Sequence, residues 1–316
     1  MHGRGALAYS TLQPGLDQFV SSQGYISYYS FRDPILAPNP IYIVIGDPIA
    51  PLSSFPTIIG DFLKTASSAL FLQVGEHCAG VLDRYGLAVN RSGLETDLDL
   101  RRFDLKGKLK ANLRHWVNTA RKKGIEAFEQ DLLRMDRGEV NGLSREWLQR
   151  KGGKEMALLT RPLEWRAQPD VRFFWARGSG RLLALTTFDP MYDGGRIYGY
   201  YRDIVRCRSD APHGTSDLVT ITAIEKFRRE GINVLAMGCS PLASLGDEPF
   251  HAATLIRRLF RLMRDYGDFV YSFKGLEFHK KYYRGKESPV YFATTSRTTL
   301  LQLRDLIILA QALRLI

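Results

Sequence analysis

The chain has 316 residues, of which 45% are hydrophobic, which suits two folded domains of ordinary size and excludes a disordered chain. A net charge of +11 and a sequence pI of about 9.6 indicate a polyanionic partner, either nucleic acid or an anionic membrane. A basic surface without a special role is the alternative.

The three cysteines, Cys78, Cys207 and Cys239, form no CxxC pair and no His/Cys cluster with the spacing of metal ligands. We therefore predict neither a metal site nor a disulfide framework, which suits a reducing cytoplasm. No apolar run is long enough to span a bilayer. The predicted location is cytoplasmic, with contact at the inner face of the membrane left open.

The first half of the sequence predicts a β-hairpin, a helix, a strand, a helix and an extended segment. Runs of aromatic and β-branched residues mark the strands, and Gly or Pro residues end them. The expected elements are residues 25–31 and 41–45 for the hairpin, then 55–66, 70–74, 76–85 and 87–100.

A helix rich in lysine and arginine is expected over residues 104–123. Its apolar positions fall at helical spacing on one face: Leu109, Leu113, Trp116, Val117 and Ala120. Its other face carries Lys106, Lys108, Lys110, Arg114, Arg121, Lys122 and Lys123. Few acids are interleaved, so this stripe suits nucleic-acid phosphates, although a solvated helix face is the ordinary alternative.

The second half repeats this order, which indicates a duplicated domain with limits at 1–135 and 136–316. The expected helices are residues 139–151, 215–230 and 250–266, and the expected strands are 171–176, 181–188, 197–205, 233–237, 269–273 and 289–294. The last two strands bracket a basic loop. The apolar carboxyl-terminal segment is expected to pack on the second domain, with a membrane-facing role as the alternative.

Polar residues gather at the strand ends of residues 197–247, a predicted strand, helix, strand unit. Asp203 and Arg206 lie where the first strand ends, and Gly238-Cys239-Ser240-Pro241 breaks the second. Ligands of open sheets bind at such ends, so we place the active site in the second domain.

The order of elements in each half resembles that of the acyl-CoA N-acyltransferase fold, commonly called GNAT. The segment FKGLEFHKKYYRGKESPVYFA, residues 273–293, resembles the closing signature of the phosphatidylglycerol lysyltransferase C-terminal domain family, which is roughly F-K-G-L, K-x-K-F and P-x-Y-L-A. The matching residues are Phe273, Lys274, Gly275, Leu276, Lys280, Pro289, Tyr291 and Ala293.

Further matches extend the resemblance over nearly the whole chain. Asp203 and Arg206 match the family's D-L-M-R segment, Gly214 and Asp217 its P-x-G-x-x-D turn, and residues 240–242 its G-x-(A/S)-P-L turn. In the first half, residues 46–48 and the stretch FDLKGKLKANLR are also similar to the family.

This resemblance implies an α/β fold of two tandem GNAT-like domains, with mixed sheets flanked by helices, in a soluble member that lacks the family's membrane domain. It implies transfer of an amino acid from an aminoacyl-tRNA to a hydroxyl or amine of a phosphatidylglycerol-like lipid or a small molecule. The aminoacyl-tRNA is the co-substrate, and no cofactor is expected. Residues 208–214 keep only one glycine of a coenzyme A cradle. The alternatives are an acyl-CoA-dependent N-acyltransferase and a non-catalytic module that binds tRNA or membrane.

Catalytic roles are expected for three residues. Asp203 is suited to hold the α-ammonium group, Arg206 to pair with Asp203 or bind a phosphate, and Lys280 to hold the terminal ribose-phosphate or stabilise the leaving 3′-oxygen. A structural Asp203–Arg206 pair is the alternative. The expected substrate-binding residues are Glu155, Tyr201, Gly214, Asp217, Ser240 and Tyr291. The expected tRNA-binding residues are Lys106, Lys108, Lys110, Arg114, Lys274, Lys281 and Arg284.

Overall fold

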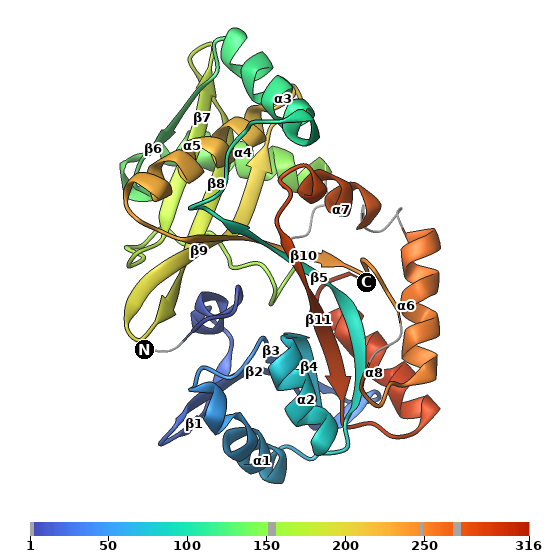
Figure 1. Ribbon diagram of the computed structural model, residues 1–316. Helices are drawn as coiled ribbons and strands as arrows, with labels where there is room; N and C mark the ends of the chain where they lie inside the picture. Colours follow the sequence, from blue (N-terminus) through green and yellow to red (C-terminus); the bar gives the residue numbers. More distant parts are fainter. Residues whose placement is uncertain (1–2, 151–155, 247–248, 268–272, 316) are drawn as a thin grey trace.

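The computed structural model describes residues 3–150, 156–246, 249–267 and 273–315 (Figure 1). Within these residues, eleven strands form one mixed sheet in the order β1-β2-β3-β4-β11-β5-β10-β9-β8-β7-β6. Helices cover both of its faces (Figure 1). The predicted class, mixed sheets flanked by helices, is confirmed, and the sheets of the two halves are joined edge to edge between β5 and β10.

The first half follows the predicted order. Its elements are β1 (Asp17–Ser21), β2 (Gly24–Asp33), β3 (Ala37–Ile45), α1 (Phe55–Thr65), β4 (Ala69–Val74), α2 (Glu76–Arg84) and β5 (Ala88–Asp99). The strands β2 and β3 pair as the expected hairpin, and β3 runs parallel to β4. The edge strand β1 was not predicted.

The second half contains the predicted strand, helix, strand unit. After α3 (Ala111–Lys122) and β6 (Glu126–Glu129), which end the first half of the sequence, its elements are α4 (Arg137–Arg150), β7 (Arg172–Gly178), β8 (Arg181–Asp193), β9 (Arg196–Cys207), α5 (Thr215–Arg229) and β10 (Val234–Pro241). Since β9 and β10 are parallel, their carboxyl ends lie at the same edge of the sheet.

Elements from each half of the sequence complete the other half in space. The strand β11 (Lys286–Thr294) lies between β4 and β5, antiparallel to both. The helix α3 and the strand β6 pack with α5 and β7. The domain limits 1–135 and 136–316 therefore remain a prediction about the sequence. In space, β11 lies among strands of the first half, and α3 and β6 pack on elements of the second half.

The two faces of the first-half sheet have different cores. Alternating residues of β4 point to opposite faces: Phe71 packs under α1 and α2, whereas Leu70 and Leu72 pack with residues of α6 (Thr254–Tyr266) and α8 (Thr299–Ala312). The carboxyl-terminal helix α8 thus packs on strands of the first half as well as on elements of the second. No helix of the described residues is long and apolar enough to cross a bilayer.

The segment before β11 corrects one prediction. Phe273 begins a helix, α7 (Phe273–Lys281), where a strand ending at residue 273 and a basic loop were expected. Residues 269–272 lie outside the described residues. Leu276 is half-buried, and Lys280 and Tyr283 are buried. Lys280 follows Leu276 by four residues and Tyr283 follows Lys280 by three, which is helical periodicity.

The basic helix also starts later than predicted. Gly107 has φ +81° and precedes a short 3₁₀ turn at Lys108–Lys110, so α3 begins at Ala111. Leu109, which the spacing placed on the apolar face, is 67% exposed. Leu113, Val117 and Ala120 are buried as predicted.

Close packing of α3 on α5 depends on Gly214. This residue has φ +89°, and a Cβ atom there would lie 2.2 Å from the carbonyl oxygen of Trp116. We expect Gly214→Ala to lower the free energy of unfolding by about 2–4 kcal/mol, measured by denaturant unfolding. The control is Gly180→Ala, with φ +77° but no atom within 4 Å, which should cost about 1 kcal/mol. Equal losses in the two variants would show that contact with Trp116 does not require glycine at this position.

Candidate active site

A buried lysine lies where α7 meets the carboxyl end of β10. Lys280 is 4% exposed, and its Nζ donates a hydrogen bond of 2.6 Å to the carbonyl oxygen of Cys239. Burial, together with the charge of Arg202, lowers the pKa of Lys280 to about 8, against the opposing effects of Cys239 and Glu95. This ammonium group can therefore gain or lose a proton near neutral pH.

The strand β10 is irregular at this point. Gly238 has φ +81°, and the register of β10 against β5 shifts between Ala236 and Cys239, which is a β-bulge. A Cβ atom on Gly238 would lie 2.9 Å from the Tyr201 ring. Burial raises the pKa of the Cys239 thiol to about 12, so this thiol stays protonated and is a poor nucleophile.

Glu95 on β5, which the sequence did not single out, faces the same region. It is the register partner of Cys239 across the sheet. Burial and the charge of Asp97 raise the pKa of Glu95 to about 8, although Lys280 opposes this shift. Its Oε1 atom is buried and has no hydrogen-bond partner among the described residues. A carboxyl group and an ammonium group that both titrate near pH 8 are typical of general acid–base sites.

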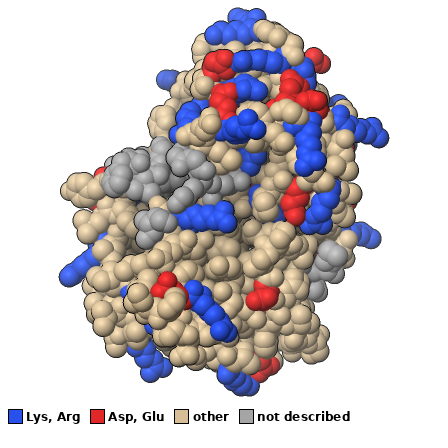
Figure 2. All heavy atoms as spheres, turned by 180° about the vertical axis from the view of Figure 1, so that it is seen from behind, with Lys and Arg blue, Asp and Glu red and all other residues tan. Residues whose placement is uncertain are grey.

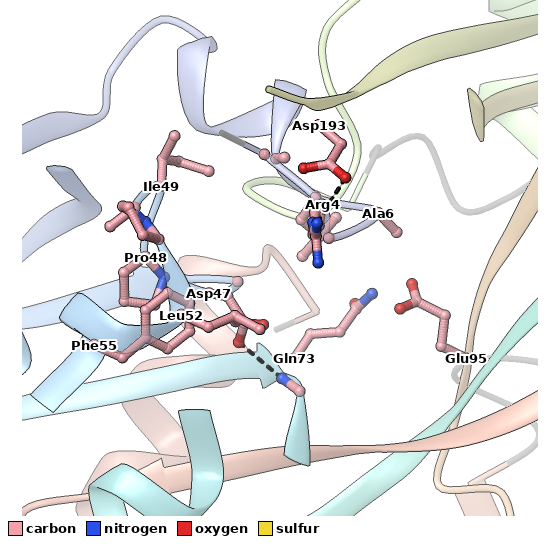
Figure 3. A pocket seen from close by; sticks show the side chains of 18 of the residues that line it. Arg4, Ala6, Asp47, Pro48, Ile49, Leu52, Phe55, Gln73, Glu95 and Asp193 are labelled. Atoms are coloured by element: carbon pink, nitrogen blue, oxygen red, sulfur yellow. Dashed lines mark hydrogen bonds and ion pairs between the residues drawn. The ribbon is translucent and has the colours of Figure 1, made fainter. Parts of the chain in front are cut away.

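A cavity of about 380 Å³ extends from Glu95 into the first half (Figure 3). Figure 3 shows the Gln73 amide and the Glu95 carboxylate pointing toward one another, with Asp47 nearby. The facing wall is apolar and consists of Pro48, Ile49, Leu52 and Phe55. The cavity therefore combines acid and amide groups with hydrocarbon, and the Arg4–Asp193 ion pair also lines it.

The backbone is irregular at the cavity floor as well. Gln73 has φ +52°, a conformation uncommon for a residue other than glycine, and the register of β4 against β11 shifts beside it. Asp47 accepts a hydrogen bond of 2.8 Å from the backbone N–H of Gly75. Burial raises the pKa of Asp47. Strained backbone of this kind is often found at binding sites.

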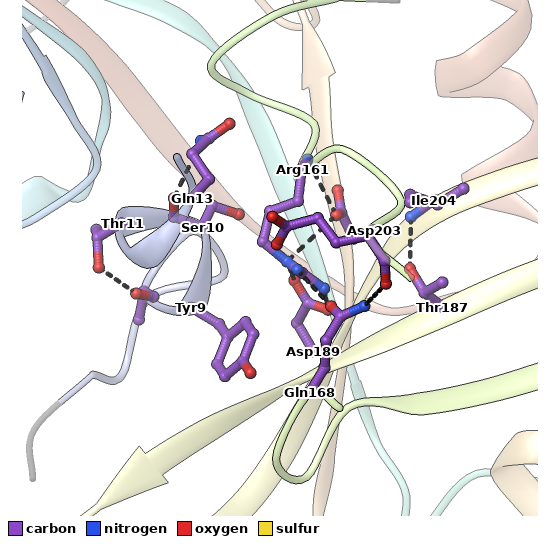
Figure 4. Close-up of polar contacts among 12 residues, drawn as sticks. Tyr9, Ser10, Thr11, Gln13, Arg161, Gln168, Thr187, Asp189, Asp203 and Ile204 are labelled. Atoms are coloured by element: carbon purple, nitrogen blue, oxygen red, sulfur yellow. Dashed lines mark hydrogen bonds and ion pairs between the residues drawn. The ribbon is translucent and has the colours of Figure 1, made fainter. Parts of the chain in front are cut away.

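Asp203 belongs to a buried cluster around Arg161 (Figure 4). The Arg161 guanidinium donates two hydrogen bonds, of 2.6 and 2.7 Å, to Asp189 and one of 2.8 Å to Gln168. Asp203, 1% exposed, accepts the Arg161 backbone N–H at 3.2 Å and lies 4.0 Å from its Nε. The Tyr9 ring lies 4.9 Å from the guanidinium. Sequence reasoning missed Arg161 and Asp189 because neither lies in a recognisable motif.

Arg206 contacts two residues of α4. Its side chain is buried, donates a hydrogen bond of 2.6 Å to the Ser144 hydroxyl, and lies over the Trp147 ring. Asp203 contacts Arg161, and the pairing of Asp203 with Arg206 stays a prediction.

Asp217 connects α5 to α7. It accepts hydrogen bonds from His279 at 2.9 Å and from Tyr283 at 2.7 Å. Burial raises the pKa of Asp217, but these hydrogen bonds and the charge of His279 outweigh it, so the carboxyl pKa lies below its usual value. Its neighbour Ser216 accepts a hydrogen bond from the buried Arg202, whose Nε has no partner among the described residues. Arg202 was also missed by sequence reasoning.

The other expected substrate-binding residues divide into two groups. Tyr201 and Ser240 are buried near the bulge, so the structure brings them together with Lys280. Tyr291 is 1% exposed and packs edge-on against Phe250 in the first-half core, away from that group. Glu155 lies outside the described residues.

Of the residues expected to bind tRNA, Lys106, Lys108 and Arg284 are exposed. Lys110 donates a hydrogen bond to the Asp104 carbonyl, and Arg114 donates to the carbonyl of Gly107, so both stabilise the preceding loop. Lys281 forms an ion pair of 2.6 Å with Glu277. Lys274 lies in α7, but its side chain is outside the described part of the structure. Lysine and arginine are frequent on the upper half of Figure 2, where α3 to α5 lie.

Known proteins resemble this chain along most of its length. A 260-residue match with the phosphatidylglycerol lysyltransferase of Bacillus subtilis has 28% identity and covers 79% of this chain but 29% of that protein. Two solved structures share the fold. The structure of L-PGS from Bacillus licheniformis has a TM-score of 0.78 with 23% identity, covering 97% of this chain and 92% of that one.

The other structure is the C-terminal domain of a putative lysylphosphatidylglycerol synthetase from Agrobacterium fabrum. Its TM-score is 0.76 with 21% identity, covering 98% of this chain and 94% of that one. The sequence model described as phosphatidylglycerol lysyltransferase, C-terminal, matches residues 19–294. The chain therefore belongs to the phosphatidylglycerol lysyltransferase C-terminal domain family.

Proposed function

We propose that the protein is an aminoacyltransferase that moves an amino acid from an aminoacyl-tRNA to a hydroxyl or amine of a phosphatidylglycerol-like lipid or a small molecule. The observation that carries this proposal is a pair of buried groups at a β-bulge beside a cavity, Glu95 as the base and Lys280 as the acid, each with a pKa of about 8 and each shifting the pKa of the other. Membership of a family named for a lysyltransferase supports it.

An aminoacyl ester is already activated, so the protein has to position it and move protons. The acceptor oxygen or nitrogen attacks the ester carbonyl, and Glu95 takes the proton that the acceptor loses. The bond from the carbonyl carbon to the 3′-oxygen then breaks. Lys280 stabilises the leaving oxygen and donates a proton to it, because an ammonium group has further donors besides the one used on Cys239. Proton exchange with water restores both groups.

The pKa values predict the pH dependence of transfer. Below a pH of about 8, Glu95 is increasingly protonated and accepts no proton, and above it Lys280 loses the charge that stabilises the leaving oxygen. The rate should therefore be highest near this pH and fall on both sides, with apparent pKa values that belong to the coupled pair.

Two further assignments are part of this proposal. Asp203 would hold the α-ammonium group of the amino acid, although its present contacts are with Arg161. The exposed Lys106, Lys108 and Arg284 would contact tRNA phosphates, and the acceptor would occupy the cavity beside Glu95.

The test uses tRNA charged with each labelled amino acid in turn, together with a total lipid and metabolite extract. We expect label to leave the tRNA for at least one amino acid, to appear in a new compound, and to stay on the tRNA in Glu95→Gln. The matched control Glu287→Gln changes an exposed glutamate on β11 and should leave transfer intact. Label that stays on every tRNA would contradict the proposal, and acetyl-CoA binding in that case would favour an acyl-CoA-dependent N-acyltransferase.

A further inference from the structure

Four aromatic rings form a row where α7, α3 and the start of α5 meet. The ring centroids of Phe278 and Tyr282 are 4.8 Å apart, and those of Tyr282 and Trp116 are 4.7 Å apart. The row continues from Trp116 to His213 at 4.8 Å. All three contacts are edge-to-face. Three separate segments of the chain thus build this surface, which we name the aromatic row.

The two ends of the aromatic row face solvent. Phe278 is 62% exposed, and His213 is also exposed, whereas Tyr282 and Trp116 between them are half-buried. Aromatic rings that serve only as core packing are normally covered by other side chains. Rings that are grouped at the surface and left open to solvent indicate a binding surface.

The aromatic row lies on the opposite side of α7 from the candidate active site. Phe278 and Tyr282 are four residues apart and share one side of α7 and the turn after it, whereas Lys280 and Tyr283 are buried on the other side. Lys280 donates its hydrogen bond to the carbonyl oxygen of Cys239 on β10, and Figure 1 shows α7 between α3 and β10. Because a helix with its side chains is about 10 Å across, a strand bound on the row lies within one helix width of Lys280.

The charges around the aromatic row favour a polyanion. The helix α3 contains no acidic residue. The acids on α7 and beside the start of α5 are already bound to basic side chains, and they are Asp210, Asp217 and Glu277. Arg284, two residues after Tyr282, is exposed, as are Lys106 and Lys108 before α3. Aromatic rings among exposed cations are typical of surfaces that bind single-stranded nucleic acid, because bases stack on the rings and phosphates contact the cations.

We propose that the aromatic row binds the unpaired 3′ end of the aminoacyl-tRNA, with its bases stacked on Phe278 and the neighbouring rings and its phosphates in contact with Arg284. This inference rests on the proposed function for its partner. The amino acid is attached to the terminal ribose, so the RNA has to approach Lys280 as a single strand, whose base faces are free to stack. A base-paired stem fits less well, because its base faces are covered by the neighbouring pairs.

The test measures binding of uncharged RNA hairpins to the full chain by fluorescence anisotropy, with no acceptor present. One hairpin ends in a short run of unpaired nucleotides, a second is blunt, and in a third the unpaired nucleotides keep their phosphates but lack their bases. We expect the first hairpin to bind at least about tenfold more tightly than the other two, because only its bases can stack. Added salt should weaken the binding of all three, because they share the phosphate contacts.

Variants of Phe278 separate stacking from apolar contact. Phe278→Leu keeps an apolar side chain but has no ring, so it should bind the first hairpin about tenfold more weakly and the blunt hairpin as before. Phe278→Trp should keep the affinity of the unchanged protein. The matched control is Tyr85→Leu, which removes a ring that is 46% exposed at the end of α2 and should leave binding intact. Thermal unfolding of every variant checks that it is folded.

Three outcomes would overturn the proposal. One is the absence of binding by all three hairpins, and another is equal binding of the first and third hairpins, which would assign the affinity to phosphates alone. The third is equal affinity of Phe278→Leu and the unchanged protein for the first hairpin. The proposed function fails by a different result, since label that stays on every tRNA together with base-dependent binding would make the aromatic row part of a non-catalytic tRNA-binding module.

Discussion

Replacing Lys280 with methionine should lower the single-turnover rate of aminoacyl transfer by about a hundredfold to a thousandfold, the usual effect of removing a group that stabilises a developing oxyanion. The methionine side chain is similar in shape to that of lysine, but it carries no charge and no hydrogen-bond donor. The fall of the rate above a pH of about 8 should also disappear, because that fall is assigned to deprotonation of Lys280.

Three measurements separate this role from a structural one. Lys64→Met, which changes an exposed lysine of α1 paired with Asp61, should keep the normal rate. The free energy of unfolding of Lys280→Met should not fall, because burying an ammonium group is itself costly. The affinity for tRNA, measured separately, should be nearly unchanged. A normal transfer rate in Lys280→Met would show that Lys280 has only a structural role, as the donor of the hydrogen bond that joins α7 to the Cys239 carbonyl.

Replacing Arg161 with methionine should lower the free energy of unfolding by about 3–5 kcal/mol at neutral pH. The guanidinium is 5% exposed and bound through two hydrogen bonds to Asp189, which is 0% exposed, so the variant leaves an uncompensated carboxylate in the interior. Urea unfolding measures the effect. Arg166→Met, at a position 60% exposed and paired with Glu164, is the control and should change the free energy by less than about 0.5 kcal/mol.

The loss of unfolding free energy in Arg161→Met should be larger at high pH than at low pH. Burial already raises the pKa of Asp189, and removing Arg161 raises it further, so folded protein binds a proton that unfolded protein does not. Stability is then retained below the unfolded pKa of about 3.9 and lost as pH rises through the folded value, so the deficit is smaller at pH 5 than at pH 8. Adding Asp189→Asn should recover part of the loss. A deficit independent of pH would show that packing, and not the buried charge, is responsible.

Local pattern in the sequence was sufficient for most elements. The alternation and length of apolar runs predicted β4 and β11, and the spacing of Leu218, Ile221 and Ile224 predicted α5. These signals are local because side-chain period depends only on backbone geometry. The prediction of a basic loop after residue 273 was wrong because its many charged residues do not distinguish a loop from a helix, and packing of Tyr283 and Lys280 in the interior selected the helix α7.

The sequence by itself determined the fold class, the family and Lys280 as a candidate, because periodicity, turn chemistry and short motifs are properties of neighbouring residues. Tertiary structure decided the rest. Glu95 became a candidate only because β10 and β11 lie on either side of β5 in the sheet. Asp203 contacts Arg161 only because the segment that contains Arg161 packs against β9. The pKa of a buried group depends on burial and on charges brought from separate parts of the chain, and no local pattern records which parts will meet.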